Sequence, residues 1–347
     1  MTRAHPARAA LVVVVAAAMA LVTTASTASA TSRQTGDEHP SDVARPDRPE
    51  GCRRASLPSG VTDRTVVSGG IVRHYQLTIP PGYTGRKPLP VVLGFHALTV
   101  PYQFVASQVG FADMEARYDF IGVAPSGLLD HGTPYWLAAP VRPNYDLRFV
   151  DDLLDRLEHD LCVDTSRIYA TGMSNGAQMS SLLACRMSNR IAAVAPVAGA
   201  EFYPRCHGRP VPVIAFHGTA DPIVTYDGGG LNSVRIADID FWKGNDPKDL
   251  PVDRGLDVSM QRWAEHNGCD GEPVETRIAP EVRLRTWRDC RAETAFYIVD
   301  GGGHAWPGKP VPGFENLFGH TTTEIDASTL IFRFLFAQRL HTTHDDR

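Results

Sequence analysis

Short apolar runs alternate with amphipathic stretches along most of the chain. Residues 71–79 alternate apolar and polar side chains with a period of two and stop at a Pro-Pro-Gly turn signal, which predicts a strand with one exposed face. Six short, almost wholly apolar runs predict strands covered on both faces: residues 91–95, 121–124, 167–171, 191–197, 213–216 and 295–299. Three stretches carry apolar residues at helical spacing: residues 149–161, 177–187 and 329–340.

This alternation of strands and helices predicts an α/β fold. Its core is a mostly parallel central sheet flanked by helices on both faces. The period-two strand at residues 71–79 is expected to form an antiparallel edge. No internal repeat or second linker interrupts the pattern, so residues 51–341 are predicted to form a single catalytic domain.

The N-terminal residues predict export. Arg3 and Arg8 precede an uncharged apolar run over residues 9–22, and Ala28-Ser29-Ala30 fits a small-residue cleavage site. These are the three regions of a secretory signal peptide, predicted at residues 1–30, with cleavage near Ala30 and a secreted product. Residues 31–50 have few large apolar side chains and are expected to form a disordered tail.

Composition narrows the possible partners. The chain has 347 residues, of which 43% are hydrophobic, which excludes wholesale disorder. A formal net charge of −5 gives no reason to expect nucleic-acid binding. No stretch after the predicted signal peptide is long and apolar enough to span a bilayer, so no membrane partner is expected after cleavage. The oligomeric state is left open.

The sharpest chemical signal is Gly172-Met173-Ser174-Asn175-Gly176. A predicted strand runs into this G-x-S-x-G motif and a predicted helix follows it directly. That setting is typical of a nucleophile elbow, in which a serine sits on a strained turn beside a helix N-terminus. Ser174 is therefore the candidate nucleophile.

A serine hydroxyl needs a base to take its proton and a carboxylate to orient that base. On this architecture the chain order is serine, acid, histidine, each at the end of a strand. Asp221 follows the strand at 213–216, and His304 follows the strand at 295–299 after three glycines. We therefore predict Ser174, Asp221 and His304 as a catalytic triad.

Several neighbours compete for these roles. Asp227 is the closer rival for the acid, while Asp300 lies too near His304 in sequence to orient it easily. His320 is a weaker candidate for the base. His217 and His96 end apolar strands, and we expect them to make structural hydrogen bonds beside the site rather than to catalyse.

Acyl transfer also requires donors for the developing oxyanion. One is expected to be the amide of Asn175, directly after the nucleophile. The other is expected from the loop after residues 91–95, at Ala97, or at Leu98 if the register slips by one.

Four segments carry a family resemblance: residues 167–177 (RIYATGMSNGA), 192–199 (AAVAPVAG), 217–224 (HGTADPIV) and 301–308 (GGGHAWPG). In this order they resemble the secreted polyhydroxybutyrate depolymerase/feruloyl esterase family of α/β-hydrolases, from about Arg73 to Phe336. The resemblance implies an α/β-hydrolase fold and carboxylic ester hydrolysis by Ser174, Asp221 and His304. It does not identify the ester, because polyester, feruloyl and acetyl-xylan esterases share these motifs. The family usually has His-Gly where this chain has His96-Ala97, a departure expected to reshape the oxyanion site.

The sequence signals for substrate-binding residues are less specific than those for the catalytic residues. Trp306 follows the predicted base closely and is a candidate aromatic wall, and His96 is the second candidate substrate-binding residue. Residues 226–255 are rich in Gly, Asp and Pro, and a lid and an ordinary surface excursion are equally compatible with them. The substrate is expected to be a small-molecule or polymeric ester.

Six cysteines in an exported chain predict three disulfides, although six permit 15 pairings. Our hypothesis pairs Cys52 with Cys162, Cys185 with Cys206, and Cys269 with Cys290. No zinc-type spacing occurs, so we expect no metal and no cofactor. Two other functions stay open at this point: a secreted serine peptidase of the same fold, and a catalytically silent binding protein.

Overall fold

The computed structural model describes residues 50–54, 57–130, 132–229 and 254–340. These residues belong to one compact unit, Asp47–Arg347. The predicted signal peptide, residues 31–49 of the predicted tail and most of the segment 226–255 lie outside the described residues. The predictions for them stay predictions.

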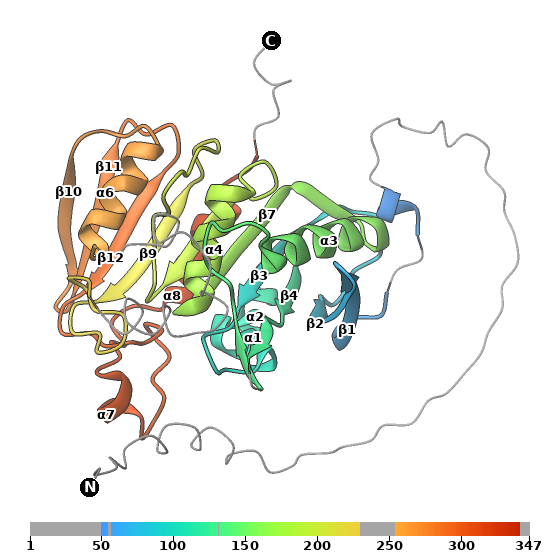
Figure 1. The fold of residues 1–347 in the computed structure, drawn as a ribbon, viewed down its shortest axis with the longest axis horizontal. Coiled ribbons are helices and arrows are strands. Elements are labelled where there is room, and N and C mark those ends of the chain that lie inside the picture. The colour runs from blue at the N-terminus through green and yellow to red at the C-terminus, as the bar shows by residue number, and fades with distance from the viewer. Residues whose placement is uncertain (1–49, 55–56, 131, 230–253, 341–347) are drawn as a thin grey trace, which may run out of the picture. The chain divides into compact units, whose positions relative to one another are not determined.

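A ten-stranded sheet forms the centre of this unit (Figure 1). Its spatial order is β1-β2-β4-β3-β7-β8-β9-β12-β11-β10. The bounds of these strands are β1 Gly60–Ser68, β2 Ile71–Ile79, β3 Leu89–Phe95, β4 Ile121–Pro125, β7 Val163–Met173, β8 Ala193–Val197, β9 Val213–Gly218, β10 Asp270–Ala279, β11 Val282–Arg288 and β12 Thr294–Val299. From β4 to β12 all neighbours pair in parallel, whereas β1, β2, β10 and β11 form antiparallel edges.

Helices cover both faces of the sheet. Their bounds, with those of the short 3₁₀ turns, are η1 Glu50–Arg53, η2 Tyr102–Phe104, α1 Val105–Val109, α2 Phe111–Glu115, α3 Tyr145–Asp160, α4 Asn175–Arg186, α6 Leu256–His266, α7 Glu315–Phe318 and α8 Ala327–Phe336. A separate two-stranded ribbon joins β5 Leu128–Asp130 to β6 Thr133–Tyr135. Asparagine and aspartate side chains cap the first turns of α3 and α8 respectively, which explains where these helices begin.

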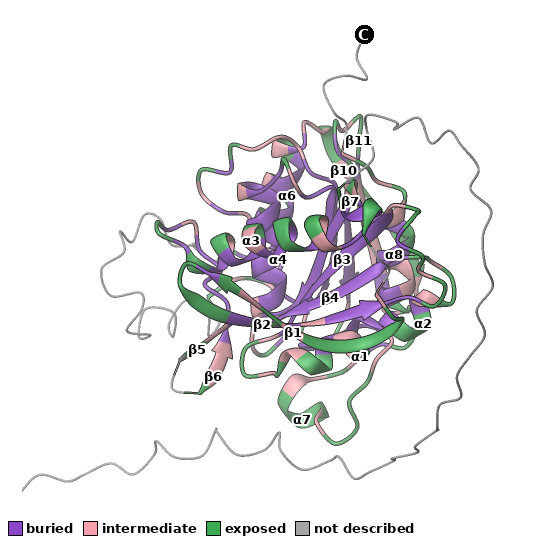
Figure 2. Cartoon of the chain, turned by 90° about the vertical axis from the view of Figure 1, so that its right-hand side faces the viewer, coloured by how far each residue is buried: buried purple, intermediate pink, exposed green. Residues whose placement is uncertain are grey.

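The core has two layers because successive side chains of a strand point to opposite faces. In β3, Val91, Leu93 and Phe95 pack in one apolar cluster with residues of α3, α4 and α6. Val92 packs in the other cluster with residues of α1, α2 and α8. Every residue of β3 is buried, and Figure 2 shows the central strands buried between the helical layers. The predicted α/β-hydrolase-type arrangement, a mostly parallel sheet flanked by helices, is confirmed.

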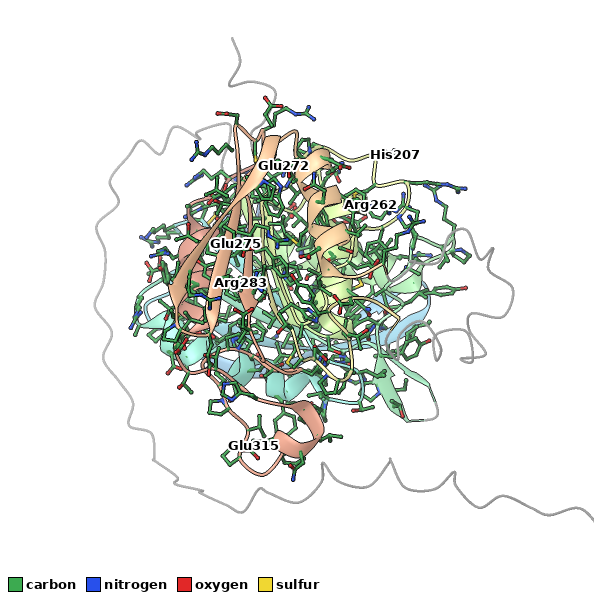
Figure 3. All side chains as sticks on the ribbon, turned by 90° about the vertical axis from the view of Figure 1, so that its left-hand side faces the viewer. His207, Arg262, Glu272, Glu275, Arg283 and Glu315 are labelled. Carbon is green, nitrogen blue, oxygen red and sulfur yellow. A yellow bond between two sulfur atoms is a disulfide. The ribbon has the colours of Figure 1, made fainter. Side chains whose placement is uncertain are left out.

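The antiparallel hairpin β10–β11 was not predicted. Most of β10 faces solvent and its sequence has no apolar run, whereas β11 alternates apolar and polar residues and buries Val282 and Trp287. Ion pairs also stabilise the hairpin: Arg283 contacts Glu275 at 2.8 Å and Asp300 at 2.6 Å. Figure 3 labels Glu275 and Arg283 on this hairpin. Asp300, a weak rival for the catalytic acid, is therefore part of a structural ion-pair network.

Three disulfides join the cysteines in the predicted pairs. Cys52 pairs with Cys162, Cys185 with Cys206, and Cys269 with Cys290. The hypothesis on connectivity is confirmed. Among the described residues, no helix combines the length and apolar character needed to cross a bilayer.

Candidate active site

Ser174 lies on a sharp turn between β7 and α4. Its backbone has φ 57° and ψ −122°, a conformation that a non-glycine residue adopts only when its surroundings enforce it. The Ser174 amide donates to the Val197 carbonyl at 2.9 Å, which anchors the turn to β8. The geometry is the one predicted for a nucleophile elbow.

Two glycines make this turn sterically possible. A Cβ at Gly176 would lie 2.1 Å from the Phe95 carbonyl oxygen, and one at Gly172 would lie 2.7 Å from the same atom. Both distances are far shorter than real contacts. The elbow therefore packs directly against the end of β3, whose following loop carries Ala97.

His304 and Asp221 come together at the carboxyl edge of the sheet. His304 Nδ1 lies 2.7 Å from Asp221 Oδ2, and both side chains are buried. Because a carboxylate only accepts, Nδ1 carries the proton and Nε2 is left as a proton acceptor. Since β7, β9 and β12 run parallel, the residues that follow them all lie at this one edge.

Backbone hydrogen bonds link the two loops that carry His304 and Asp221. Ala220 N donates to the Gly302 carbonyl at 2.9 Å, and Gly301 N donates to Thr219 Oγ1 at 2.8 Å. A Cβ at Gly218 would lie 2.2 Å from Gly302 O, so the two loops need glycine to approach this closely. The pair is therefore preorganised.

Asp221 is ionised in this arrangement. Its Oδ1 accepts hydrogen bonds from the amides of Ile223 and Val224 at 2.8 and 2.9 Å. Burial raises the pKa of the Asp221 carboxyl, but hydrogen bonds from His217 and His304 outweigh burial and hold the pKa below its ordinary range.

His217 is a second imidazole beside Asp221. Its Nε2 lies 2.8 Å from the Val224 carbonyl and 3.3 Å from Asp221 Oδ2. These contacts agree with the structural role predicted for His217. Its Nδ1 is buried and, among the described residues, has no hydrogen-bond partner.

His96 is also fully buried. Its Nδ1 donates to the Ala97 carbonyl at 2.8 Å, and its Nε2 accepts from the Gly127 amide at 2.9 Å. Burial lowers the pKa of His96 to about 4, which keeps the ring neutral at pH 7. Both ring nitrogens are thus used inside the protein, which fits the structural role and does not favour the predicted contact with substrate.

The candidate oxyanion donors lie on the two segments that meet at the elbow. Asn175 is the first residue of α4, so its amide has no partner within the helix. Ala97 is half-buried, and no described residue accepts a hydrogen bond from its amide. Ala97 is not among the described non-glycine residues with positive φ, so alanine fits there without backbone strain.

The remaining candidates from the sequence are Trp306, His320 and Asp227. Trp306 is 2% exposed and donates through Nε1 to Ser328 Oγ at 3.1 Å, a core position that does not favour contact with substrate. The sequence analysis missed an aromatic residue beside the predicted base: the Phe318 ring centroid is 6.4 Å from that of His304. The His320 side chain binds Glu281 at 2.9 Å. Asp221, and not Asp227, contacts His304.

A cavity of about 370 Å³ lies away from these groups, between β1, β2 and α3. Its lining includes Arg64, Tyr75 and Arg156, and none of the predicted site residues. We place the candidate active site at the His304–Asp221 pair, because chemistry depends on the reactive groups and not on cavity size.

The fold is of the α/β-hydrolase type, with the Ser174 turn and the His304–Asp221 pair at the carboxyl ends of its parallel strands. The chain is 31% identical over 257 residues to Feruloyl esterase C of Emericella nidulans, covering 68% of this chain and 88% of that protein. The chain belongs to the feruloyl esterase family, whose members are carboxylic ester hydrolases.

Other comparisons agree. Feruloyl esterase B of Piromyces equi is 28% identical over 242 residues, and the match spans 65% of this chain but only 41% of that longer protein. Acetyl xylan esterase from Aspergillus awamori superposes with a TM-score of 0.51 at 14% identity, covering 74% of this chain and 97% of that one, which shows the shared fold. No family model matches the chain.

Proposed function

We propose that the chain is a secreted serine esterase that works through an acyl-enzyme, with Ser174, His304 and Asp221 as its catalytic triad. The observation that carries this proposal is the 2.7 Å hydrogen bond from His304 Nδ1 to Asp221, at the sheet edge where the Ser174 elbow also lies. Membership of the feruloyl esterase family supports it independently.

The first half of the reaction forms the acyl-enzyme. Ser174 Oγ attacks the ester carbonyl carbon while His304 Nε2 takes the hydroxyl proton. The carbonyl oxygen becomes an oxyanion, which the amides of Asn175 and Ala97 stabilise. The bond to the leaving alcohol then breaks, and His304 returns the proton to that alcohol.

The second half uses water. His304 takes a proton from a water molecule, whose oxygen attacks the acyl carbon, and the same two amides stabilise the new oxyanion. The bond to Ser174 Oγ breaks, the proton returns to Oγ, and the carboxylic acid leaves. Asp221 keeps its charge throughout and holds the imidazole in one tautomer.

For the substrate we propose an ester with an aromatic acyl group, as in the feruloyl esters of the plant cell wall. Relatives named feruloyl esterases support this choice. The half-buried Phe318 ring beside His304, stacked on Phe314 with centroids 5.9 Å apart, supplies an apolar surface for such a ring. Contact between two aromatic rings stabilises by about 0.5–1.5 kcal/mol beyond the contribution of the apolar surface that it buries.

Export is part of the proposal. Three disulfides fit an oxidising compartment outside the cytoplasm. The predicted signal peptide at residues 1–30 supplies the route.

The test is a substrate panel with the protein lacking residues 1–30. Its members are methyl ferulate, acetylated xylan, short p-nitrophenyl esters, amorphous polyhydroxybutyrate and a peptide anilide. We expect turnover of esters with a preference for methyl ferulate, labelling of Ser174 by a fluorophosphonate, and loss of both in Ser174→Ala. Faster cleavage of the anilide than of the esters would indicate a peptidase, and absence of labelling would indicate a silent binding protein. Unchanged activity of Ser174→Ala would refute the triad.

A further inference from the structure

The peptide group between His96 and Ala97 is hydrogen-bonded at its carbonyl oxygen, on the side opposite to the N–H that we propose binds the oxyanion. Its N–H belongs to Ala97, and its carbonyl oxygen accepts a hydrogen bond from Trp136 Nε1 at 3.1 Å. In a trans peptide the N–H and the C=O point in opposite directions. The indole N–H therefore sets the direction in which the Ala97 amide points. It also polarises the peptide group and strengthens its N–H as a donor.

The backbone of Trp136 is held by the residue that provides the second oxyanion donor. Asn175 Oδ1 accepts from Trp136 N at 2.7 Å, and Asn175 Nδ2 donates to Trp136 O at 3.1 Å. This two-point contact fixes Asn175 at the start of α4 through its side chain, while its own amide stays available. Trp136 thus contacts both segments that carry the proposed oxyanion donors.

Trp136 is itself rigidly held. Its side chain is 2% exposed and packs edge-on against Phe95, with ring centroids 5.0 Å apart. The next residue, Leu137, donates its amide to Asp146 Oδ2 at 2.7 Å. Asp146 in turn forms a fully buried ion pair with Arg73 at 2.6 Å. Because these contacts fix Trp136, its indole N–H holds the His96–Ala97 peptide in one orientation.

We propose that Trp136 is a positioning residue, which aligns the Ala97 and Asn175 amides for the transition-state oxyanion. The proposal rests on the proposed function. It differs from a plain packing role because it requires the indole N–H, and it predicts an effect on the transition state rather than on substrate binding. Oxyanion donors act where charge develops, so their misalignment lowers kcat and leaves KM unchanged.

The first test is Trp136→Phe, which keeps an aromatic ring and removes the N–H. We expect kcat for methyl ferulate to fall by about 10- to 100-fold, less than the roughly 10²- to 10³-fold cost of losing a whole donor. We expect KM to stay within a factor of about two, and affinity for a trifluoromethyl ketone transition-state analogue to fall by the same factor as kcat/KM.

Trp263→Phe is the matched control. Trp263 is also fully buried and donates through Nε1 to a backbone carbonyl, that of Glu201, at 3.1 Å. It lies on α6, which packs against β12, and its ring packs edge-on against Phe202. We expect this variant to lose stability while kcat and analogue affinity stay at the wild-type level.

A second replacement covers the case in which Trp136→Phe does not fold. β-(3-Benzothienyl)alanine introduced at position 136 keeps the size of the indole but has sulfur in place of the N–H. It is expected to show the same loss of kcat and of analogue affinity. The proposal is overturned if this protein matches the wild type, or if Trp136→Phe and Trp263→Phe change kcat equally. Failure of the proposed function looks different, because the wild type itself would then neither hydrolyse the ester nor bind the analogue.

Discussion

The Asp221 carboxylate accepts hydrogen bonds through both of its oxygens. Oδ1 binds two backbone amides, and Oδ2 faces the imidazoles of His304 and His217. An acceptor satisfied in this way stays charged inside the protein, and its charge is what orients a catalytic imidazole. Asp227, six residues along the chain, makes no such contact with His304.

This contrast predicts the outcome of two matched substitutions. Asp221→Asn is expected to lower kcat by about 10³- to 10⁴-fold, because a neutral amide neither fixes the imidazole tautomer nor stabilises the imidazolium. Asp227→Asn, the control of the same chemistry, is expected to stay within a factor of about two. Steady-state kinetics on p-nitrophenyl acetate distinguish the two variants, and a larger loss in Asp227→Asn would reverse the choice of acid.

His96 predicts a pH dependence of stability. Its pKa is about 4 in the folded chain, against 6.5 in an unperturbed histidine. As the pH falls from 6.5 to 4, His96 therefore becomes protonated in the unfolded state but not in the folded state. The contribution of neutral His96 to the free energy of unfolding is complete above pH 6.5. It is lost between pH 6.5 and pH 4, by at most roughly 3 kcal/mol.

His96→Gln removes this titration and keeps an acceptor for the Gly127 amide. We expect the variant to be less stable than the wild type at pH 7 and the difference to shrink toward pH 4. Urea unfolding of both proteins at pH 7, 5.5 and 4 measures that difference, and titration of all other groups cancels in it. A difference that stays constant over this range contradicts the buried, neutral state of His96.

At the scale of elements, α7 and the loop around it extend beyond the sheet (Figure 1). Backbone hydrogen bonds fasten this loop to the histidine that we propose as the base: His304 N donates to Phe318 O at 2.5 Å, and Gly303 N donates to His320 O at 2.7 Å. A Cβ at Gly303 would lie 2.0 Å from Phe318 O. The position of Phe318 is therefore tied to that of His304.

Phe318→Ala is expected to act on substrate choice. Loss of one aromatic contact is expected to lower kcat/KM for methyl ferulate by about 3- to 10-fold and to leave p-nitrophenyl acetate nearly unaffected. Leu317→Ala is the control, because Leu317 is on the same helix and is 49% exposed. The measured quantity is the ratio of the two kcat/KM values. An unchanged ratio in Phe318→Ala would remove this ring from the acyl site.

Elements with a local signal were predictable from the sequence. Strand β2 alternates apolar and polar residues, β3 and the end of β7 are apolar runs, and the elbow is a contiguous motif. All of them therefore follow from short segments of the sequence. Strand β10 has no such signal because it is mostly exposed, and paired charges join it to β11, whose period-two alternation was overlooked. Its Arg285, for example, binds Asp257 on α6 at 2.7 Å.

Parts of the site that depend on contacts distant in sequence were not predictable. Trp136 bonds residues 39 and 40 positions away, and nothing within the segment Tyr135-Trp136-Leu137 indicates this. The position of Trp306 two residues after His304 predicts an aromatic wall at the site, yet its indole turns into the core toward α8. Phe318 reaches His304 through a loop that folds back, a feature set by backbone geometry and not by any motif.

At the scale of the whole molecule, the disulfides differ in how much chain they enclose. Cys52–Cys162 spans 110 residues and joins the start of the described chain to the beginning of β7. Cys185–Cys206 and Cys269–Cys290 each span 21 residues. All six cysteines are paired. The long bridge restricts the unfolded chain most.

Removing each bridge in turn is expected to show this difference. By the chain-entropy relation, a 110-residue loop contributes roughly 1.5 kcal/mol more to the free energy of unfolding than a 21-residue loop. Cys52→Ala with Cys162→Ala is therefore expected to cost about 4–5 kcal/mol, and either of the other double variants about 3 kcal/mol. The two 21-residue bridges serve as controls for each other, because any difference between them measures local packing and not loop length. Guanidinium unfolding at fixed pH, followed by tryptophan fluorescence, gives the three values. A Cys52–Cys162 variant no less stable than the other two would contradict this prediction. Loop closure would then not account for the contribution of this bridge to the free energy of unfolding, and its effect would lie in the contacts of η1 with α3.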